Sequence, residues 1–229
     1  MKNIMNSNTM NEGKYKYPRT PHLPWSPGWT SDDVRKTSVD QFIGKEIVIT
    51  EKMDGENTTM YTNYIHARSI DSRHHRSRDW VKRLHATLKC NIPQGWRLCG
   101  ENLYAKHAIH YYALPSYFLL FSIWDENNDC LSWDQTLEWA EILGLNTPAI
   151  LYRGLWNQAW FDKFSIETDQ CEGYVVRLSE GYHYDEFTQC VAKWVRASHV
   201  QSDKHWMHAA IIANHMIKSK ETNTGGDHE

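Results

Sequence analysis

The sequence EIVITEKMDGEN, residues 46–57, carries a lysine from an apolar stretch directly into a polar turn. Its first six residues are rich in β-branched side chains, which favour a strand. Gly55 permits the chain to bend sharply just after the lysine. Residues 58–68 then predict a hairpin of two further strands. We therefore expect Lys52 to lie at the end of one strand and close to the start of the next.

A lysine in this position could act as a nucleophile, provided that its amine is uncharged. Burial away from water lowers the pKa of a lysine, and so do neighbouring cations such as a metal or basic side chains. Taken alone, the segment of residues 51–57 is equally typical of a surface lysine before an ordinary Asp-Gly turn. The choice between these two interpretations depends on the rest of the chain.

Outside this motif, the pattern of apolar residues predicts a mixed α+β domain with antiparallel sheets. Residues 79–88 have apolar side chains at helical spacing and begin with an aspartate, which suits the positive end of a helix dipole. Ser132 opens a capping box and a helix that ends at Leu143, with Gly144 as its stop signal. We expect a further short helix between about residues 202 and 217. Short apolar runs predict strands at residues 96–99, 117–124, 173–178 and 188–195.

The composition is that of a globular protein. Of the 229 residues, 41% are hydrophobic and 23% are charged, which excludes general disorder. The net charge is −3 at pH 7, so any affinity for polyanions must come from local patches of basic residues. The five cysteines are widely spaced and form no C-x-x-C pair, which argues against a cysteine zinc site and a disulfide-linked partner. We expect reduced and mostly buried thiols.

The two ends of the chain differ in character from its middle. Four prolines fall between residues 18 and 27, so we expect residues 1–30 to form an extended, partly mobile leader. Residues 31–200 would form the folded domain, and residues 201–229 a short helical extension with a polar tail. The sequence contains no signal-peptide-like segment and no apolar run long enough to cross a membrane. We therefore expect a cytoplasmic protein without a membrane partner.

Four charged residues stand where nucleotide chemistry would need them. Arg68 ends the predicted hairpin and could hold a phosphate or ribose oxygen with its planar guanidinium group. Glu101 ends a predicted strand and could accept ribose hydroxyl groups. Glu172 precedes an apolar strand, where a carboxylate is costly unless a metal or cation compensates it. Lys193 lies inside an apolar strand and needs a phosphate or carboxylate for the same reason. A solvated arginine and an ordinary loop glutamate are the alternatives for the first two.

Six short motifs resemble, in order, the signatures of the covalent nucleotidyltransferases, the superfamily of ATP-dependent RNA ligases, DNA ligases and mRNA capping enzymes. The RNA ligase branch is the most similar, and the resemblance extends from about Tyr17 to Met207. The motifs are EKMDGEN (51–57), HARS (66–69), LCGENLYAKH (98–107), FLLFSIWD (118–125), EGYVVR (172–177) and VAKWVR (191–196). This resemblance implies an α+β nucleotidyltransferase fold, similar to that of the ATP-grasp proteins, with mainly antiparallel sheets flanked by helices.

By this resemblance, Lys52 would take AMP from ATP as a phosphoramide and release pyrophosphate. Glu172 would bind or organise the divalent metal, Mg or Mn. Lys193 would hold the α-phosphate and help to keep the Lys52 amine uncharged, since two nearby cations disfavour each other's protonated form.

The same resemblance implies the remaining contacts with the nucleotide. Glu51 would contact the adenine edge, Asn57 and Arg68 the sugar and phosphates, and Glu101 the ribose. Phe121 would stack on the base, as aromatic side chains generally can. The run around Phe121 is apolar enough that this ring is equally at home in the core.

The last motif departs from the pattern of the family. These ligases commonly end in Lys-x-Lys, whereas the residue two positions after Lys193 is Val195. The next basic residue, Arg196, should point to the opposite face of the strand. Whether Arg196 replaces a second phosphate-binding lysine stays open, and only Lys193 is carried over.

A cluster of basic residues follows the predicted hairpin. It consists of Arg73, Arg76, Arg78, Lys82 and Arg83. Its position would place positive charge beside the nucleotide site, where the 5′-phosphate of a nucleic acid must come to accept AMP. The alternative is a solvated polar loop and helix face.

These observations predict an ATP-dependent RNA ligase that joins a 3′-hydroxyl to a 5′-phosphate through a lysyl-AMP intermediate and an AMP-capped 5′ end. Residues 194–229 are too few for the OB-fold that DNA ligases and capping enzymes usually append, and residues 1–51 leave little room for a nicotinamide-recognition module. The alternatives are transfer to another acceptor (DNA ends or nicks, 5′-diphosphate RNA or a protein) and a catalytically inactive relative that binds nucleotide or nucleic acid.

Overall fold

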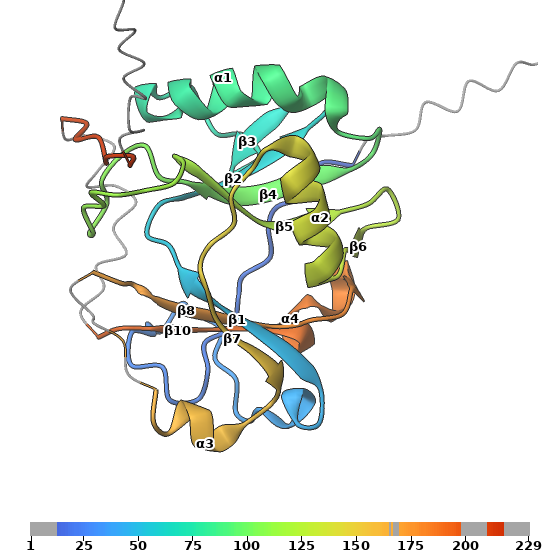
Figure 1. Cartoon of the computed structure of the whole chain (residues 1–229), viewed down its shortest axis with the longest axis vertical. Coiled ribbons are helices and arrows are strands. Elements are labelled where there is room, and N and C mark those ends of the chain that lie inside the picture. Colours follow the sequence, from blue (N-terminus) through green and yellow to red (C-terminus); the bar gives the residue numbers. More distant parts are fainter. Residues whose placement is uncertain (1–12, 165, 167–169, 198–209, 218–229) are drawn as a thin grey trace, which may run out of the picture.

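The structure is a computed structural model that describes residues 13–164, 166, 170–197 and 210–217. The described residues form two antiparallel sheets, one of four and one of six strands. The helices α1 (Asp79–Leu88) and α2 (Trp133–Leu143) pack on the outer face of the larger sheet (Figure 1). The predicted α+β class with mainly antiparallel sheets flanked by helices is therefore confirmed.

The four-stranded sheet has the order β10-β8-β1-β7. Its strands are β1 (Glu46–Lys52), β7 (Ile150–Leu155), β8 (Gly173–Leu178) and β10 (Val191–Val195). Residues 47–49 of β1 are all fully buried, which means that both faces of this inner strand are covered. This explains why the sequence of β1 reads as a continuous apolar run rather than as an alternation.

The six-stranded sheet has the order β3-β2-β4-β5-β6-β9. Its strands are β2 (Glu56–Tyr61), β3 (Ile65–Ala67), β4 (Arg97–Asn102), β5 (Phe118–Trp124), β6 (Asp129–Cys130) and β9 (Tyr182–His183). Residues of β2, β4 and β5 form one apolar core with α1 and α2. The predicted hairpin is formed by β2 and β3, and the strand predicted at 96–99 continues as far as Asn102.

The signals that predicted the two longer helices are confirmed in detail. The Ser132 hydroxyl accepts a hydrogen bond from the Gln135 amide at 3.2 Å, and the Gln135 side chain accepts one from the Ser132 amide at 3.0 Å. Gly144 ends α2 with a φ of 63°. Shorter helical turns connect the other elements: η1 (Asp40–Phe42), η2 (Arg76–Arg78), η3 (Lys89–Asn91), α3 (Gln158–Phe161), η4 (Tyr184–Glu186) and α4 (Phe187–Cys190).

The predicted strand at residues 188–195 was partly wrong, because its first three residues belong to α4. Strand β10 begins only at Val191. The preceding turns begin at His183, whose side chain and that of Glu186 form a capping box. This local cap favours helical turns up to Cys190, although the following apolar residues continue as a strand.

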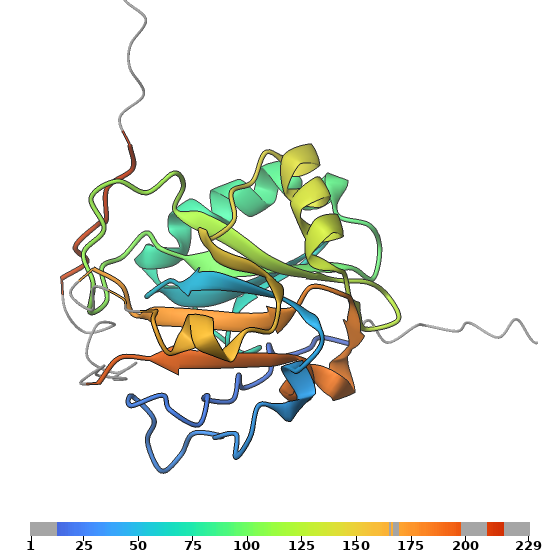
Figure 2. The same ribbon diagram turned by 60° about the horizontal axis from the view of Figure 1, so that its bottom comes forward.

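Residues 13–30 are packed against the domain in the region expected to be a leader. His22 and Leu23 are fully buried. The Leu23 amide donates a hydrogen bond to the Lys193 carbonyl at 2.7 Å, and His22 pairs in parallel with Lys193 of β10. Figure 2 shows this segment running alongside β10. It therefore extends the edge of the four-stranded sheet.

The helix expected between residues 202 and 217 is wrong for the part that the structure describes. Residues 202–209 lie outside the described residues, and residues 210–217 are extended. Ala213 pairs with Ala105, and Met216 pairs with Leu114, in isolated bridges. Because the backbone amides and carbonyls of this segment bond to another loop, they are not available for helical hydrogen bonds.

The described cysteines are free thiols, and Cys99, Cys130 and Cys190 are buried.

Among the helices described, none has the length and the apolar surface needed to pass through a lipid bilayer.

Candidate active site

The two sheets enclose a cleft of about 800 Å³, and Lys52 stands at the junction between them. Strand β1 of the smaller sheet ends at Lys52, and β2 of the larger sheet begins at Glu56. The intervening turn requires Gly55, since a Cβ atom there would lie 2.6 Å from the Asn102 carbonyl oxygen. The motif EKMDGEN thus links both walls of the cleft.

The Lys52 ammonium group forms an ion pair and a hydrogen bond with the Glu172 carboxylate. The Glu172 side chain is 3% exposed and that of Lys52 23%. Burial lowers the pKa of Lys52, but Glu172, Glu101 and Asp54 together raise it above its ordinary value. In the protein without nucleotide, the amine is therefore protonated and held by a carboxylate.

Lys193 approaches the same cleft from β10. Its ammonium group lies 3.8 Å from a carboxylate oxygen of Asp33. Burial and the charge of Lys52 lower the pKa of Lys193 to about 8, although Asp33 and Glu172 act in the opposite direction. In the free protein, the pKa of Lys193 is therefore lowered while that of Lys52 is raised.

Glu172 reaches the cleft through a close approach of two strands. The next residue, Gly173, pairs with Lys52 of β1 and with Val195 of β10. A Cβ atom at Gly173 would lie 1.9 Å from the Trp194 carbonyl oxygen, so no other residue fits here without moving the backbone. This packing brings the Glu172 carboxylate to the end of β1.

Two further carboxylates line the cleft on opposite walls. Glu101 of β4 lies opposite Asn57 of β2, and burial raises the pKa of Glu101 to about 8, with Glu172 and Asp54 adding to the effect and Lys52 opposing it. Burial also raises the pKa of Glu51 on β1, while a hydrogen bond with Cys171 lowers it.

The structure also places Asn57, Arg68 and Phe121 along the cleft. The side-chain oxygen of Asn57 is buried and has no hydrogen-bond partner among the described residues, which is unusual for a buried polar atom outside a binding site. Arg68 directly follows β3. The Phe121 ring lies edge-on to Tyr17, with ring centroids 5.1 Å apart. All eight residues predicted for the nucleotide and metal thus line one cleft, while Arg196 is not among its lining residues.

Among the charged residues of the cleft that sequence reasoning missed, three make contacts that shape the site. Asp33 comes from a polar stretch, TSDDVRK, that carries no signal of a site. Asp54 is part of the quoted motif, and its carboxylate accepts a hydrogen bond from the Ile109 amide at 2.7 Å. Arg177 of β8 is buried and donates to the carbonyl oxygens of Phe121 and Leu131, at 2.9 and 3.0 Å, so it ties the two sheets together. A cation inside an apolar strand, the signal used for Lys193, would have found Arg177.

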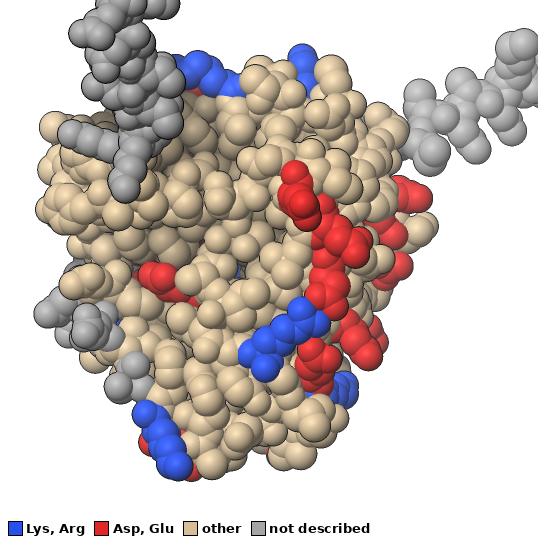
Figure 3. Space-filling view, viewed as in Figure 1, with Lys and Arg blue, Asp and Glu red and all other residues tan. Residues whose placement is uncertain are grey.

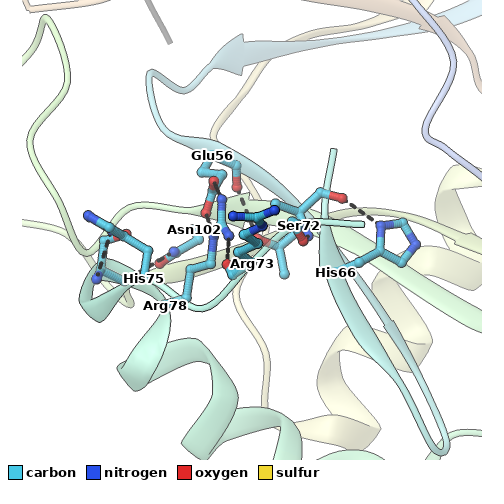
Figure 4. Close-up of polar contacts among 10 residues, drawn as sticks. Glu56, His66, Ser72, Arg73, His75, Arg78 and Asn102 are labelled. Carbon is cyan, nitrogen blue, oxygen red and sulfur yellow. Dashed lines mark hydrogen bonds and ion pairs between the residues drawn. The ribbon is translucent and has the colours of Figure 1, made fainter. Parts of the chain in front are cut away.

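The five residues of the predicted basic cluster are not equivalent. Arg78 lines the cleft, but its guanidinium group is held by both carboxylate oxygens of Glu56 (Figure 4). Arg73, Arg76 and Arg83 are exposed. Lys82 contacts a ring nitrogen of His74 at 3.1 Å. In Figure 3, Lys and Arg side chains at the upper edge lie over α1, apart from the acidic side chains that gather over α2.

The described residues contain no group of three or more His, Cys, Asp or Glu side chains arranged to hold a metal. The donors that fit a divalent ion are the carboxylates of Glu172 and Glu101, since Mg²⁺ prefers oxygen ligands and commonly takes few of them from the protein. Such an ion would need the phosphates of a nucleotide to complete its coordination.

Comparison with solved structures finds the same fold. An RNA ligase of Naegleria gruberi, with pyrophosphate, matches with 15% identity and a TM-score of 0.48, over 80% of this chain and 62% of that one. An Aquifex aeolicus protein described as a "putative ATP-dependent DNA ligase" matches with 19% identity and a TM-score of 0.54, over 80% of this chain and 50% of that one. This chain thus spans between half and two thirds of the length of these two proteins. No curated protein matches it.

The family model of the RNA ligases matches residues 45–195. This match begins one residue before β1 and ends with the last residue of β10, so it includes Lys52, Glu101, Glu172 and Lys193. The chain belongs to the RNA ligase family.

Proposed function

We propose that this protein is an ATP-dependent RNA ligase that joins a 3′-hydroxyl to a 5′-phosphate. The observation that carries the proposal is the position of the Lys52 amine, at the junction of two sheets and in contact with the buried Glu172 carboxylate. Glu101 and Lys193 line the same cleft, and the RNA ligase family model covers all four residues.

The reaction would proceed in three steps. The Lys52 nitrogen attacks the α-phosphorus of ATP, a nitrogen–phosphorus bond forms, and pyrophosphate leaves. A 5′-phosphate oxygen of RNA then attacks the same phosphorus, which breaks the bond to Lys52 and yields an AMP-capped end. The 3′-oxygen of the other end finally attacks the 5′-phosphate, loses its proton and displaces AMP.

The residues of the cleft suit the first of these steps. Glu51 and Phe121 would contact the adenine, and Glu101 the ribose. The unpartnered oxygen of Asn57 would find a donor in the nucleotide. Arg68 and Lys193 would face the phosphates, since planar and buried cations are well suited to phosphate oxygens.

Lys52 must lose its proton before it attacks. Because Glu172, Glu101 and Asp54 raise its pKa, any loss of their negative charge makes the amine easier to deprotonate. Lys193 would also disfavour the protonated form of Lys52, since two nearby cations oppose each other's charge. A divalent cation, Mg or Mn, would be held by Glu172 with the nucleotide phosphates and would offset the charge of the triphosphate.

The first prediction tests the nucleophile directly. We expect Lys52→Ala to abolish the covalent uptake of label from ATP that carries a radioactive α-phosphate, because no other amine replaces that of Lys52. The matched control is Lys45→Ala, which removes an exposed lysine just before β1 and should leave the labelling unchanged. Labelling that persists in Lys52→Ala would refute the assignment.

The acceptor is tested with matched nicks of RNA, of DNA and of hybrids, incubated with ATP and magnesium. A protein that recognises the 2′-hydroxyl should seal RNA better than DNA. The AMP-capped intermediates and the sealed products should be followed together, since their ratio separates the second step from the third. Equal sealing of an all-DNA nick would contradict the proposed RNA acceptor.

A further inference from the structure

Asn214 is a buried polar residue far from Lys52 in the sequence, and its hydrogen bonds all go to one loop. It is 1% exposed. Its amide nitrogen and side chain make hydrogen bonds of 2.8 to 3.4 Å, and its carbonyl oxygen accepts one of 2.8 Å. The partners are Leu103, Tyr104, Ala105, Tyr111 and Tyr117. A buried side chain that is satisfied in this way specifies one arrangement of its partners.

These partners belong to the wall loop, which we define as residues 103–117. Its residues 105–108 line the cleft, as do residues 210–212 of the segment that contains Asn214. The Lys106 amide donates a hydrogen bond to the Ile212 carbonyl at 2.7 Å. Residues 210–217, hereafter the strap, lie beside the wall loop in both Figure 1 and Figure 2. The strap therefore completes one wall of the cleft.

The wall loop is connected in turn to the residues that follow Lys52. The Asp54 carboxylate accepts a hydrogen bond from the Ile109 amide at 2.7 Å, and the Asp54 amide donates one to the Tyr111 hydroxyl at 2.9 Å. Tyr111 joins the two ends of this chain of contacts, because its own amide donates to the Asn214 side chain at 2.9 Å. Asp54 is 5% exposed, so the turn has little freedom to move independently of the loop.

We propose that Asn214 is a positioning residue for the nucleophile, because it holds the wall loop through which Asp54 fixes the Lys52 turn. This inference rests on the proposed function of Lys52. Asn214 touches neither of the reacting groups. Its effect is on the geometry of attack, to which a group-transfer step is very sensitive: a misplacement of about 1 Å can cost about a hundredfold in rate.

The test compares Asn214→Ala and Tyr111→Phe with the control Ile217→Ser, which alters an exposed side chain on the same strap. The rate of Lys52–AMP formation is measured at saturating ATP, together with the KM for ATP. We expect the rate to fall about 10- to 100-fold in Asn214→Ala, with KM within about threefold. KM should hold because the proposed adenine and ribose contacts, Glu51, Glu101 and Phe121, lie on strands. Ile217→Ser should behave like the wild type.

A double-mutant cycle separates positioning from a general loss of stability. If Asn214 and Tyr111 act through the same loop, the double variant should be no slower than the slower single variant by more than about threefold. The proposal would be overturned if the losses in rate of the two single variants multiplied in the double variant. It would also be overturned if Asn214→Ala folded and formed Lys52–AMP at a rate within about twofold of the wild type. If Asn214→Ala does not fold, Tyr111→Phe alone decides, because it removes one hydroxyl and leaves the ring in place.

A second measurement does not depend on catalysis. Amide hydrogen exchange at residues 53–57, without ATP, should be faster in Asn214→Ala than in Ile217→Ser, because the Asp54 amide loses the support of Tyr111. Equal exchange rates at residues 53–57 in the two variants would contradict the proposal that Asn214 supports the Lys52 turn. A wild type that takes up no label would instead count against the proposed function of Lys52, so the two failures are distinguishable.

Discussion

Lys193 and Lys52 lie in the same cleft, but their surroundings shift their pKa values in opposite directions. Lys52 contacts Glu172 directly and has a raised pKa. Lys193 is 3.8 Å from Asp33, and burial together with Lys52 lowers its pKa to about 8. At neutral pH both ammonium groups are therefore charged in the free protein, with Lys193 the closer of the two to losing its proton.

Asp33 forms the ion pair with Lys193 and favours its charged form. One of its carboxylate oxygens accepts hydrogen bonds from the amide and hydroxyl of Thr30, both at 3.0 Å, and the other faces Lys193. Asp33→Asn keeps the shape and removes the charge, so it should lower the pKa of Lys193 further. If the α-phosphate is bound by charged Lys193, the rate of adenylylation should decline at a lower pH in this variant.

The measurement is the rate of Lys52–AMP formation between about pH 6 and pH 10, where the alkaline limb reports the loss of a required proton. Asp32→Asn is the matched control, since Asp32 is exposed and adjacent. An alkaline limb that stays in place in Asp33→Asn would show that Asp33 does not control the charge of Lys193.

At the scale of elements, an ion pair between Arg78 and Glu56 of β2 helps to hold the segment between β3 and α1 in place. Arg78 contacts Glu56 through two nitrogens, and Asn102 of β4 donates to the Ser77 carbonyl at 3.2 Å (Figure 4). The side chains of Arg78 and Glu56 are 12% and 11% exposed. Because Arg78 is occupied in this way, the exposed Arg73, Arg76 and Arg83 are the better candidates for contact with RNA phosphates.

Arg78→Ala should lower the free energy of unfolding by about 2 kcal/mol, because it leaves the carboxylate of Glu56 without its partner. The double variant Arg78→Ala with Glu56→Gln should recover part of this loss. The control Arg76→Ala removes an exposed arginine and should change the free energy by less than about 0.5 kcal/mol. Urea unfolding measures all three. Equal stability of Arg78→Ala and Arg76→Ala would contradict a structural role for the ion pair.

The elements that the sequence predicted are those whose signals are local. The capping box at Ser132, the glycine stop at Gly144 and the β-branched run of β1 each act within a few residues. The turn of α4 was missed because it is only four residues long and continues into an apolar strand. The wrong helix near the C-terminus has another cause, since Asn214 and its neighbours bond to a loop about a hundred residues earlier.

The residues of the candidate site likewise divide into those with a local sequence signal and those that depend on distant parts of the chain. Lys52, Glu101, Glu172 and Lys193 stood out as charged residues in or next to apolar strands, and the resemblance to the ligases predicted that they share one site. The structure brings all four to one cleft. Asp33 and Asn214 could not be predicted, because their importance comes only from what the fold brings next to them. The protonation states also required the structure, since they depend on which carboxylate lies nearest to which lysine.

At the scale of the whole molecule, the N-terminal segment is fastened to the edge of the four-stranded sheet by a buried histidine. His22 is fully buried, and its ring contacts the Ser26 hydroxyl at 2.8 Å. The Ser26 hydroxyl in turn accepts a hydrogen bond from the Val195 amide at 2.9 Å. The other ring nitrogen lies 3.6 Å from Asp33. The attachment of this segment and the charge near Lys193 therefore share the same residues.

Burial, together with the charge of Lys193, lowers the pKa of His22 from 6.5 to about 4. Between these values the unfolded chain binds a proton that the folded protein does not, so stability is lost as the pH falls from 6.5 towards 4. His22 should account for a loss of about 2 kcal/mol between about pH 7.5 and pH 5. The raised pKa of Glu101 has the opposite effect, since it makes the folded protein more stable as the pH falls over an overlapping pH range. The effect of His22 must therefore be isolated by comparing the wild type with a His22 variant.

The comparison is between the wild type and His22→Gln, each unfolded in urea at the two pH values. His22→Gln should be less stable at the higher pH, because a buried contact is lost, but its stability should fall less on acidification, since glutamine does not titrate. The difference in the free energy of unfolding between the wild type and His22→Gln should therefore be smaller at the lower pH. If the difference in the free energy of unfolding stays constant, His22 does not titrate with a depressed pKa.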